Sequence, residues 1–141
     1  MAIYLDTSAL VKLFIDETTR PPVVDAVRGA PPLVIGWLSL VEFRSAIYRK
    51  VQSGEMTAGD ATRVFSDFVQ APRQPAVIVP YQESILQRAS TLIDSHGTNG
   101  LRTLDALQIS TALESGNTLF GTSDRPQADF AKSAGLEVRI F

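Results

Sequence analysis

The stretch AIYLDTSALVKLF, residues 2–14, sets a short apolar run directly against an acid. Ile3, Tyr4 and Leu5 have the composition of a buried strand, and Asp6 ends it. One explanation is structural, because an Asp at the start of a helix accepts hydrogen bonds from free backbone N–H groups. The other explanation is chemical: the strand delivers the acid to a functional site. The acids elsewhere in the chain distinguish these two explanations.

Short apolar runs alternate with helical patterns along the rest of the chain. Strands are predicted at 2–5, 33–35, 76–79, 118–121 and 137–140, and helices at about 8–15, 21–29, 38–53, 58–70, 82–95, 103–115 and 126–134. The helix at 58–70 has a clear apolar period and Thr57 as its expected cap, and APRQPA at 71–76 is a predicted connection. This alternation predicts an α/β fold in which helices cover both faces of a parallel sheet.

The composition limits both the organisation and the chemistry. With 141 residues and no linker or repeat, the chain is expected to form one domain over 1–141. A net charge of −2 argues against a protein that coats nucleic acid through bulk charge. Because there is no cysteine and only one histidine, any metal must be bound by oxygen. The longest nearly apolar run, 30–41, is too short to span a bilayer, so no membrane partner and a cytoplasmic location are expected.

Three further acids stand near predicted helix starts, and each has a structural explanation of its own. Glu42 completes the pattern SLVE at 39–42, which predicts a capping box. Asp105 follows Thr103, the expected cap of its helix, and suits the positive end of the helix dipole. Asp124 follows the fourth strand and is expected to cap the last helix. Taken one at a time, these acids are better explained by structure than by catalysis.

Taken together, the acids favour the chemical explanation. The predicted elements bring four carboxylates to one edge of the sheet, where the loops of α/β proteins form ligand sites: Asp6, Glu42, Asp105 and Asp124. Carboxylates that converge repel one another, so their pKa values rise or cations neutralise them. Mg²⁺ and Mn²⁺ prefer carboxylate and water oxygens and leave coordination positions for a substrate phosphate. Such a site can activate water for phosphodiester hydrolysis.

In its motifs the chain resembles the PIN-domain ribonucleases, and most closely the VapC-type toxins of bacterial toxin–antitoxin pairs. The resemblance rests on YLDTSALVKLF at 4–14, SLVEFRSAI at 39–47, LRTLDALQISTAL at 101–113 and TSDRPQADFAKSAGLEV at 122–138. It implies a three-layer α/β/α PIN-like fold with a central, mainly parallel sheet of four to five strands. It also implies a metal-dependent endoribonuclease that acts on RNA, forms a homodimer and is inhibited by a cognate VapB-type antitoxin.

The resemblance also assigns roles to individual residues. The acidic positions of the family fall on Asp6, Glu42, Asp105 and Asp124, and each is an acid in this sequence. Asp6 and Asp105 are expected as the central ligands of Mg²⁺ or Mn²⁺, with Glu42 and Asp124 completing the set directly or through water. The recurring hydroxyls of the family fall on Thr7 or Ser8 and on Thr122.

Substrate contacts are less well defined by the sequence. Candidate contacts for RNA phosphates are Arg44, Arg49, Lys50 and Arg102, although a solvated helix face or ordinary ion pairs explain them equally well. The chain departs from the family at Gln108, where similar sequences often carry a basic or aromatic residue, and in the long turn HGTNGLR at 96–102. Both departures concern the choice of substrate more than the chemistry.

Other readings of the motifs fit less well. A haloacid-dehalogenase-like phosphatase needs a second acid two residues after the first, where this chain has Ser8. A receiver-type signalling domain needs an Asp ending its third strand and a Lys ending its fifth, and neither is present. A non-catalytic PIN-like module that binds RNA or protein is the main alternative, and the four acids argue against it. His96 is expected to end a helix, and Trp37 to pack in the core rather than stack on bases.

Overall fold

Strands and helices alternate along the chain as the apolar pattern predicts. The computed structural model describes residues 2–15, 20–70, 76–117 and 119–141. In chain order the elements are β1 (Ile3–Leu5), α1 (Thr7–Lys12), α2 (Arg20–Gly29), β2 (Leu33–Gly36), α3 (Ser39–Gln52), α4 (Ala58–Gln70), β3 (Val77–Val79), α5 (Glu83–His96), the 3₁₀ helix η2 (Gly97–Asn99), α6 (Thr103–Glu114), β4 (Leu119–Thr122), α7 (Arg125–Ser133) and β5 (Glu137–Ile140). No helix within these ranges has the length and apolar character needed to cross a membrane.

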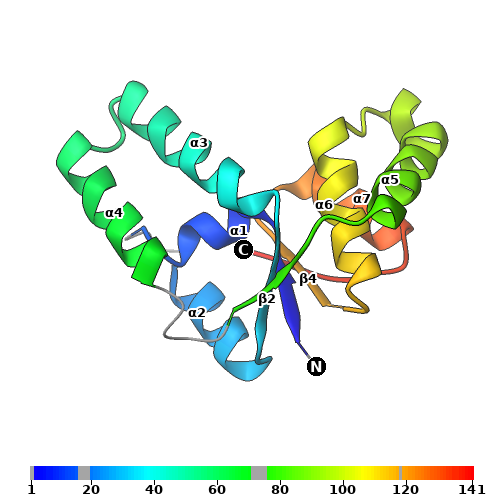
Figure 1. The fold of residues 1–141 in the computed structure, drawn as a ribbon, viewed down its shortest axis with the longest axis horizontal. Helices are drawn as coiled ribbons and strands as arrows, with labels where there is room; N and C mark the ends of the chain where they lie inside the picture. The colour runs from blue at the N-terminus through cyan, green and yellow to red at the C-terminus, as the bar shows by residue number, and fades with distance from the viewer. Residues whose placement is uncertain (1, 16–19, 71–75, 118) are drawn as a thin grey trace.

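The strands form one sheet in the order β3-β2-β1-β4-β5, and every neighbouring pair is parallel (Figure 1). The central strand is β1, where Tyr4 pairs with Val34 of β2 on one side and with Phe120 of β4 on the other. The chain thus runs from β1 outward to one edge, crosses over, and runs outward to the other edge. Because all strands point the same way, the carboxyl ends of β1, β2 and β4 meet at one edge of the sheet, where ligand sites of α/β proteins lie.

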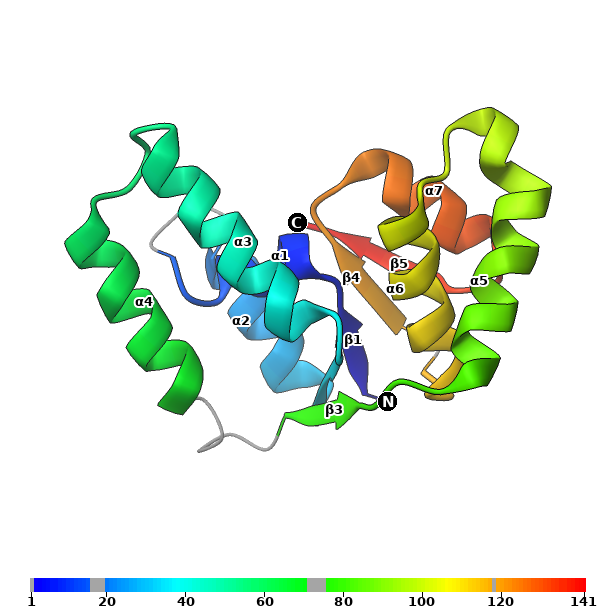
Figure 2. The ribbon, with the colours of Figure 1, turned by 45° about the horizontal axis from the view of Figure 1, so that its top comes forward.

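Helices cover both faces of this sheet, and each face has its own apolar core (Figure 2). Ile3 and Leu5 pack with α1, α2, α3 and α4, where Phe43 is fully buried. Tyr4 belongs to the opposite core, with Ile109 of α6 and residues of α5 and α7. This division follows from strand geometry, in which successive side chains point to opposite faces. The predicted three-layer α/β/α fold is confirmed, with five parallel strands.

Element boundaries agree closely with the sequence pattern where the chain is described. The helix predicted at 58–70 and the strand predicted at 137–140 begin and end at those residues. The first helix ends at Lys12 rather than near residue 15, and the fourth strand runs on to Thr122. Residues 71–75 of the predicted connection and residue 118 of the predicted strand lie outside the described residues.

Three of the predicted helix caps are confirmed. Asp6 accepts a hydrogen bond from the Ala9 N–H at 3.0 Å, and Asp124 accepts one from the Gln127 N–H at 3.1 Å. Thr57 accepts one from a backbone N–H three residues later at 3.0 Å. In each case the side-chain oxygen replaces water at an N–H group that has no partner inside the helix.

Two predicted caps are wrong. The capping box at 39–42 does not form: Leu38 occupies the cap position of α3 without a side-chain hydrogen bond. The side chains of Ser39 and Glu42 instead bond to other elements of the fold. Thr103 does not cap α6, because Arg102 occupies that position, again without a side-chain bond. At 39–42 the local pattern is overridden by hydrogen bonds to a residue that is distant in sequence.

Candidate active site

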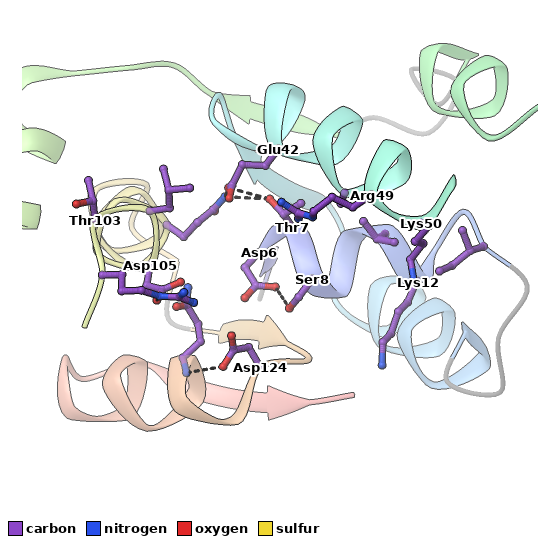
Figure 3. A pocket seen from close by; sticks show the side chains of 17 residues that line it. Asp6, Thr7, Ser8, Lys12, Glu42, Arg49, Lys50, Thr103, Asp105 and Asp124 are labelled. Carbon is purple, nitrogen blue, oxygen red and sulfur yellow. Dashed lines mark hydrogen bonds and ion pairs between the residues drawn. The ribbon is translucent and has the colours of Figure 1, made fainter. Parts of the chain in front are cut away.

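A cavity of about 660 Å³ opens at the carboxyl edge of the sheet, and its wall contains all four predicted acids. Asp6 joins β1 to α1, Glu42 lies in the first turn of α3, Asp105 in the first turn of α6, and Asp124 joins β4 to α7. Figure 3 shows their carboxylates around one space, each arriving from a different part of the fold. Residues that are far apart in the sequence therefore line the same cavity.

Asp6 is the most enclosed of these acids, with 4% of its surface exposed. Its Oδ1 accepts hydrogen bonds from Ser8 Oγ at 2.6 Å and from the Ala9 N–H at 3.0 Å. Its Oδ2 accepts a hydrogen bond from the hydroxyl of the fully buried Thr122. A buried carboxylate needs such donors in place of water. Ser8 and Thr122 therefore hold the first acid at the cavity.

The acids influence one another's protonation. Burial raises the pKa of Asp6 from 3.8 to about 6, although the bonds from Ser8, Thr122 and Ala9 oppose the rise, and the charge of Asp124 adds to it. Burial also raises the pKa of Asp105, where Arg102 acts in the opposite direction and Asp124 again adds to the rise. Like charges that share a cavity have this effect, and a bound cation reverses it.

Asp105 and Asp124 also have partners in the fold. Arg102 Nε lies 3.5 Å from Asp105 Oδ2, in a pair that solvent screens because the Arg102 side chain is 80% exposed. Asp124 caps α7, and its backbone N–H donates to Thr122 Oγ1 at 3.0 Å. Since Thr122 also donates to Asp6, this one hydroxyl connects two of the acids.

Glu42 extends from α3 toward α1 and α6. Its Oε1 accepts hydrogen bonds from Thr7 Oγ1 at 3.0 Å and from Gln108 Nε2 at 2.6 Å. The fully buried Ser39 completes this group, with its Oγ 3.0 Å from Gln108 Nε2 and 3.3 Å from Thr7 Oγ1. The two hydroxyls after Asp6 thus have different partners: Ser8 bonds to Asp6, and Thr7 bonds to Glu42.

Three of the four basic candidates line the cavity: Arg49, Lys50 and Arg102. Lys50 is paired with Glu55 at 3.4 Å and Arg102 with Asp105, so the ion-pair explanation applies to both. Arg44 is not part of the cavity wall, because its exposed side chain donates to a backbone carbonyl one turn earlier at 2.9 Å. It lies on the solvated face of α3.

The donor set suits a hydrated divalent cation. The four acids offer only oxygen, the ligand that Mg²⁺ and Mn²⁺ prefer. Within the described ranges, no three acidic or histidine side chains lie close enough to hold one ion among them. Asp6, Glu42 and Asp124 are instead bonded to different elements around the cavity. Mg²⁺ usually retains several waters and binds through one or two carboxylates, and a wide cavity with four carboxylates fits that mode.

The other residues considered from sequence pack outside the cavity wall. His96 ends α5, as predicted, and its ring lies 5.8 Å from that of Phe130. Trp37 is partly buried and meets the ring of Tyr81 edge-on at 5.5 Å. Trp37 belongs to neither of the two apolar cores, so the core packing expected for it is not confirmed.

Comparison with models of protein families identifies the family of this chain. The family described as PIN domain matches residues 3–133, which include all four acids of the cavity. The chain belongs to the PIN-domain family. No curated protein matches this PIN domain by sequence.

Solved structures similar to this PIN domain include toxins and toxin–antitoxin complexes. VapC20 of Mycobacterium tuberculosis, described as a sarcin-ricin loop cleaving toxin, has a TM-score of 0.72 at 14% identity, over 98% of this chain and 99% of that chain. VapBC2 from Rickettsia felis, bound to a promoter DNA fragment, has a TM-score of 0.70 at 12% identity, over 100% and 99% of the chains. FitAcB from Neisseria gonorrhoeae has a TM-score of 0.69 at 16% identity, over 96% and 95%. The PIN-like fold that the motifs imply is confirmed.

The cavity wall also contains residues that the sequence does not predict as part of the site, among them Lys12, Gln108 and Gln127. Gln108 stands three residues after Asp105 in α6, a spacing that places both on one face, and this signal was available in the sequence. Lys12 follows Ser8 by four residues in α1 and shares its face in the same way. Gln127 is 3% exposed, and nothing in the sequence around it distinguishes it from a surface residue.

Proposed function

We propose that this PIN domain, over 1–141, is a metal-dependent endoribonuclease that acts as the toxin of a VapBC-type toxin–antitoxin pair. The supporting observation is the group of four carboxylates around one cavity, in which burial and mutual repulsion raise the pKa of two members. A protein that used this face only as a scaffold would have no need to place these charges together.

In this proposal each part of the cavity wall has a defined role. Asp6 and Asp105 are the central metal ligands, and Glu42 and Asp124 contribute directly or through water. The chemistry that Mg²⁺ or Mn²⁺ would supply when bound there is activation of a water and polarisation of the phosphodiester. Ser8 and Thr122 orient Asp6, and Thr7 orients Glu42. Three of the basic residues in the wall are proposed to bind the RNA phosphates around the scissile bond: Arg49, Lys50 and Arg102.

The proposed partners follow from the same resemblance. The chain acts as a homodimer in the cytoplasm and is inhibited by a VapB-type antitoxin. This is supported by the fold likeness to VapBC2 from Rickettsia felis and FitAcB from Neisseria gonorrhoeae, each similar to this chain over nearly its full length. A small antitoxin gene directly upstream of the gene for this chain would support this function.

The alternative is a PIN-like module that binds RNA or protein without cleaving it. The metal dependence of RNA cleavage distinguishes a nuclease from such a binding module. A nuclease loses RNA cleavage in EDTA and regains it with Mg²⁺ or Mn²⁺, whereas a scaffold binds RNA without producing new ends.

The decisive experiment compares wild-type protein with Asp6→Asn by sequencing RNA ends after brief expression. We expect new ends and growth arrest for wild type and neither for Asp6→Asn. The matched control is Asp129→Asn, an exposed acid of α7 outside the cavity wall, which should behave as wild type. Undiminished cleavage by Asp6→Asn would refute the proposed function.

A further inference from the structure

Gln108 is an amide with specific hydrogen bonds at both ends. It lies in α6 and is 3% exposed. At one end, Oε1 accepts a hydrogen bond from the Tyr4 hydroxyl at 2.5 Å. At the other end, Nε2 lies 2.6 Å from Glu42 Oε1, 3.0 Å from Ser39 Oγ and 3.2 Å from Thr7 Oγ1. A buried amide with partners on both groups has one orientation rather than two.

Tyr4 determines that orientation. A phenol can donate its proton and an ionised carboxylate can only accept, so both partners are satisfied when the carbonyl oxygen of Gln108 faces Tyr4 and the NH₂ group faces Glu42. The Tyr4 ring is itself fixed, because it is fully buried in the central strand and stacks on Phe120 with ring centroids 5.6 Å apart. Gly36 makes room for the hydroxyl, since a Cβ at that position would lie 2.5 Å from it.

The NH₂ group of Gln108 in turn holds one oxygen of the Glu42 carboxylate. Its shortest contact is to Glu42 Oε1, the oxygen that also accepts the hydrogen bond from Thr7. A hydrogen bond from an amide to an ionised carboxylate is stronger than one to a hydroxyl. Both of these hydrogen bonds reach Oε1, and Glu42 is part of the cavity wall. Oε1 is therefore committed to the fold by two hydrogen bonds, neither of which uses Oε2.

We infer that Gln108 is a positioning residue, which Tyr4 orients and which holds Glu42 so that Oε2 alone serves the metal site. The inference rests on the proposed function, because it takes Glu42 as one of the acids around the metal. It gives the unusual glutamine of this chain a role in metal binding rather than in the choice of RNA. Hydrogen bonds that orient metal-site residues commonly change metal affinity or activity about 10–100-fold.

The test measures Mn²⁺ affinity by titration calorimetry and the kcat and KM of RNA cleavage, on the full chain. Gln108→Met keeps the length of the side chain and removes both polar ends. We expect it to weaken Mn²⁺ binding about ten-fold and to lower kcat with little change in KM. Ser110→Ala, a fully buried polar residue of the same helix outside the cavity wall, is the matched control and should leave Mn²⁺ affinity unchanged.

Two further variants identify the route of the effect. In a Glu42→Gln background, Gln108→Met should weaken Mn²⁺ binding no further, because Gln108 acts through Glu42. Tyr4→Phe removes one oxygen outside the cavity wall and keeps the ring, so it should weaken Mn²⁺ binding in the same direction and by less. If Gln108→Met does not fold, Tyr4→Phe carries the test alone: a Mn²⁺ affinity equal to that of wild type would overturn the inference.

The outcomes separate this inference from the proposed function. A wild-type protein that binds no Mn²⁺ would overturn both. A wild-type protein that binds Mn²⁺ and loses binding in Asp6→Asn, with unchanged binding in Gln108→Met, would overturn the inference and leave the proposed function standing. An equal effect of Gln108→Met with and without Glu42 would show that the amide does not act through this acid, which also overturns it.

Discussion

Asp6 combines a structural role with its proposed chemical one. It caps α1 and is a buried charge whose pKa lies near 6 instead of 3.8. The folded protein therefore binds the Asp6 proton more tightly than the unfolded chain does, and protonation stabilises the fold. This stabilisation is fully present below about pH 4 and is lost as the pH rises through about 6.

Asp6→Asn should consequently raise the free energy of unfolding at pH 7, because it removes a buried charge that is unfavourable there. We expect a gain on the order of 1–3 kcal/mol at pH 7, shrinking toward zero at pH 4, where wild-type Asp6 is protonated. Denaturant titrations at the two pH values measure it, with Asp129→Asn as the control at an exposed position of α7. A variant that is less stable than wild type at pH 7 would mean that the cap and hydrogen bonds outweigh the charge.

Thr122→Val should lower the free energy of unfolding, the opposite of Asp6→Asn, because it removes a hydrogen bond to the Asp6 carboxylate. The hydroxyl of Thr122 lowers the pKa of Asp6, so its loss moves that pKa further above 3.8. The acid side of the pH–rate profile for RNA cleavage should shift to higher pH, and the free energy of unfolding should fall by about 1–2 kcal/mol. Thr62→Val, which removes an exposed hydroxyl of α4 bonded to its own helix, is the control. An unshifted profile would mean that Asp6 ionisation does not limit cleavage.

At the scale of elements, helix starts carry most of the site. α1, α3, α6 and α7 each place an acid at or near the first turn, where the helix dipole favours negative charge. Structural and chemical roles therefore overlap at these positions, which explains why each acid has an adequate local explanation in the sequence.

Asp124 allows the two roles to be separated. Asp124→Asn keeps an oxygen that can accept the Gln127 N–H, whereas Asp124→Ala removes it. We expect Asp124→Ala to be less stable than Asp124→Asn by about 1 kcal/mol in thermal or denaturant unfolding. RNA cleavage should fall in both variants, because both remove the charge. Wild-type cleavage by Asp124→Asn would reduce Asp124 to a helix cap.

The same elements show what the sequence can and cannot predict. The period of Ala61 and Val64 and the cap at Thr57 are local, and the helix over 58–70 follows from them. The capping box at 39–42 was a local pattern too, yet Ser39 and Glu42 bond to Gln108, 69 and 66 residues away. Partner choice over such separations depends on how the layers pack. The sequence therefore predicted which acids share the cavity and not the amide that joins Tyr4 to Glu42.

At the scale of the whole molecule, the cavity wall combines residues from both helical layers. Its wall takes Asp6 and Glu42 from elements of one layer and Asp105 from the other, on either side of the sheet. A cation that binds there contacts both layers, and a ligand that binds only the folded state stabilises it by mass action.

Mn²⁺ or Mg²⁺ should therefore raise the melting temperature of the protein at neutral pH, and EDTA should reverse the shift. Free metal at a hundred times its dissociation constant adds about 2.7 kcal/mol, which is a rise of several degrees for a chain of this length. Differential scanning calorimetry measures the shift. The Asp6→Asn/Asp105→Asn double variant is the control, and its melting temperature should not change when metal is added. An equal shift in the double variant would locate the ion elsewhere.

The parallel sheet also determines where the protein can be labelled. Its last strand ends at the edge that carries the cavity, and Lys12 of the cavity wall donates to the Phe141 backbone oxygen at 3.2 Å. The other terminus leads into β1 from the opposite edge (Figure 1). A fluorophore attached near Phe141 would therefore lie beside the opening that the proposed RNA substrate enters, whereas one attached near Ala2 would leave that opening clear.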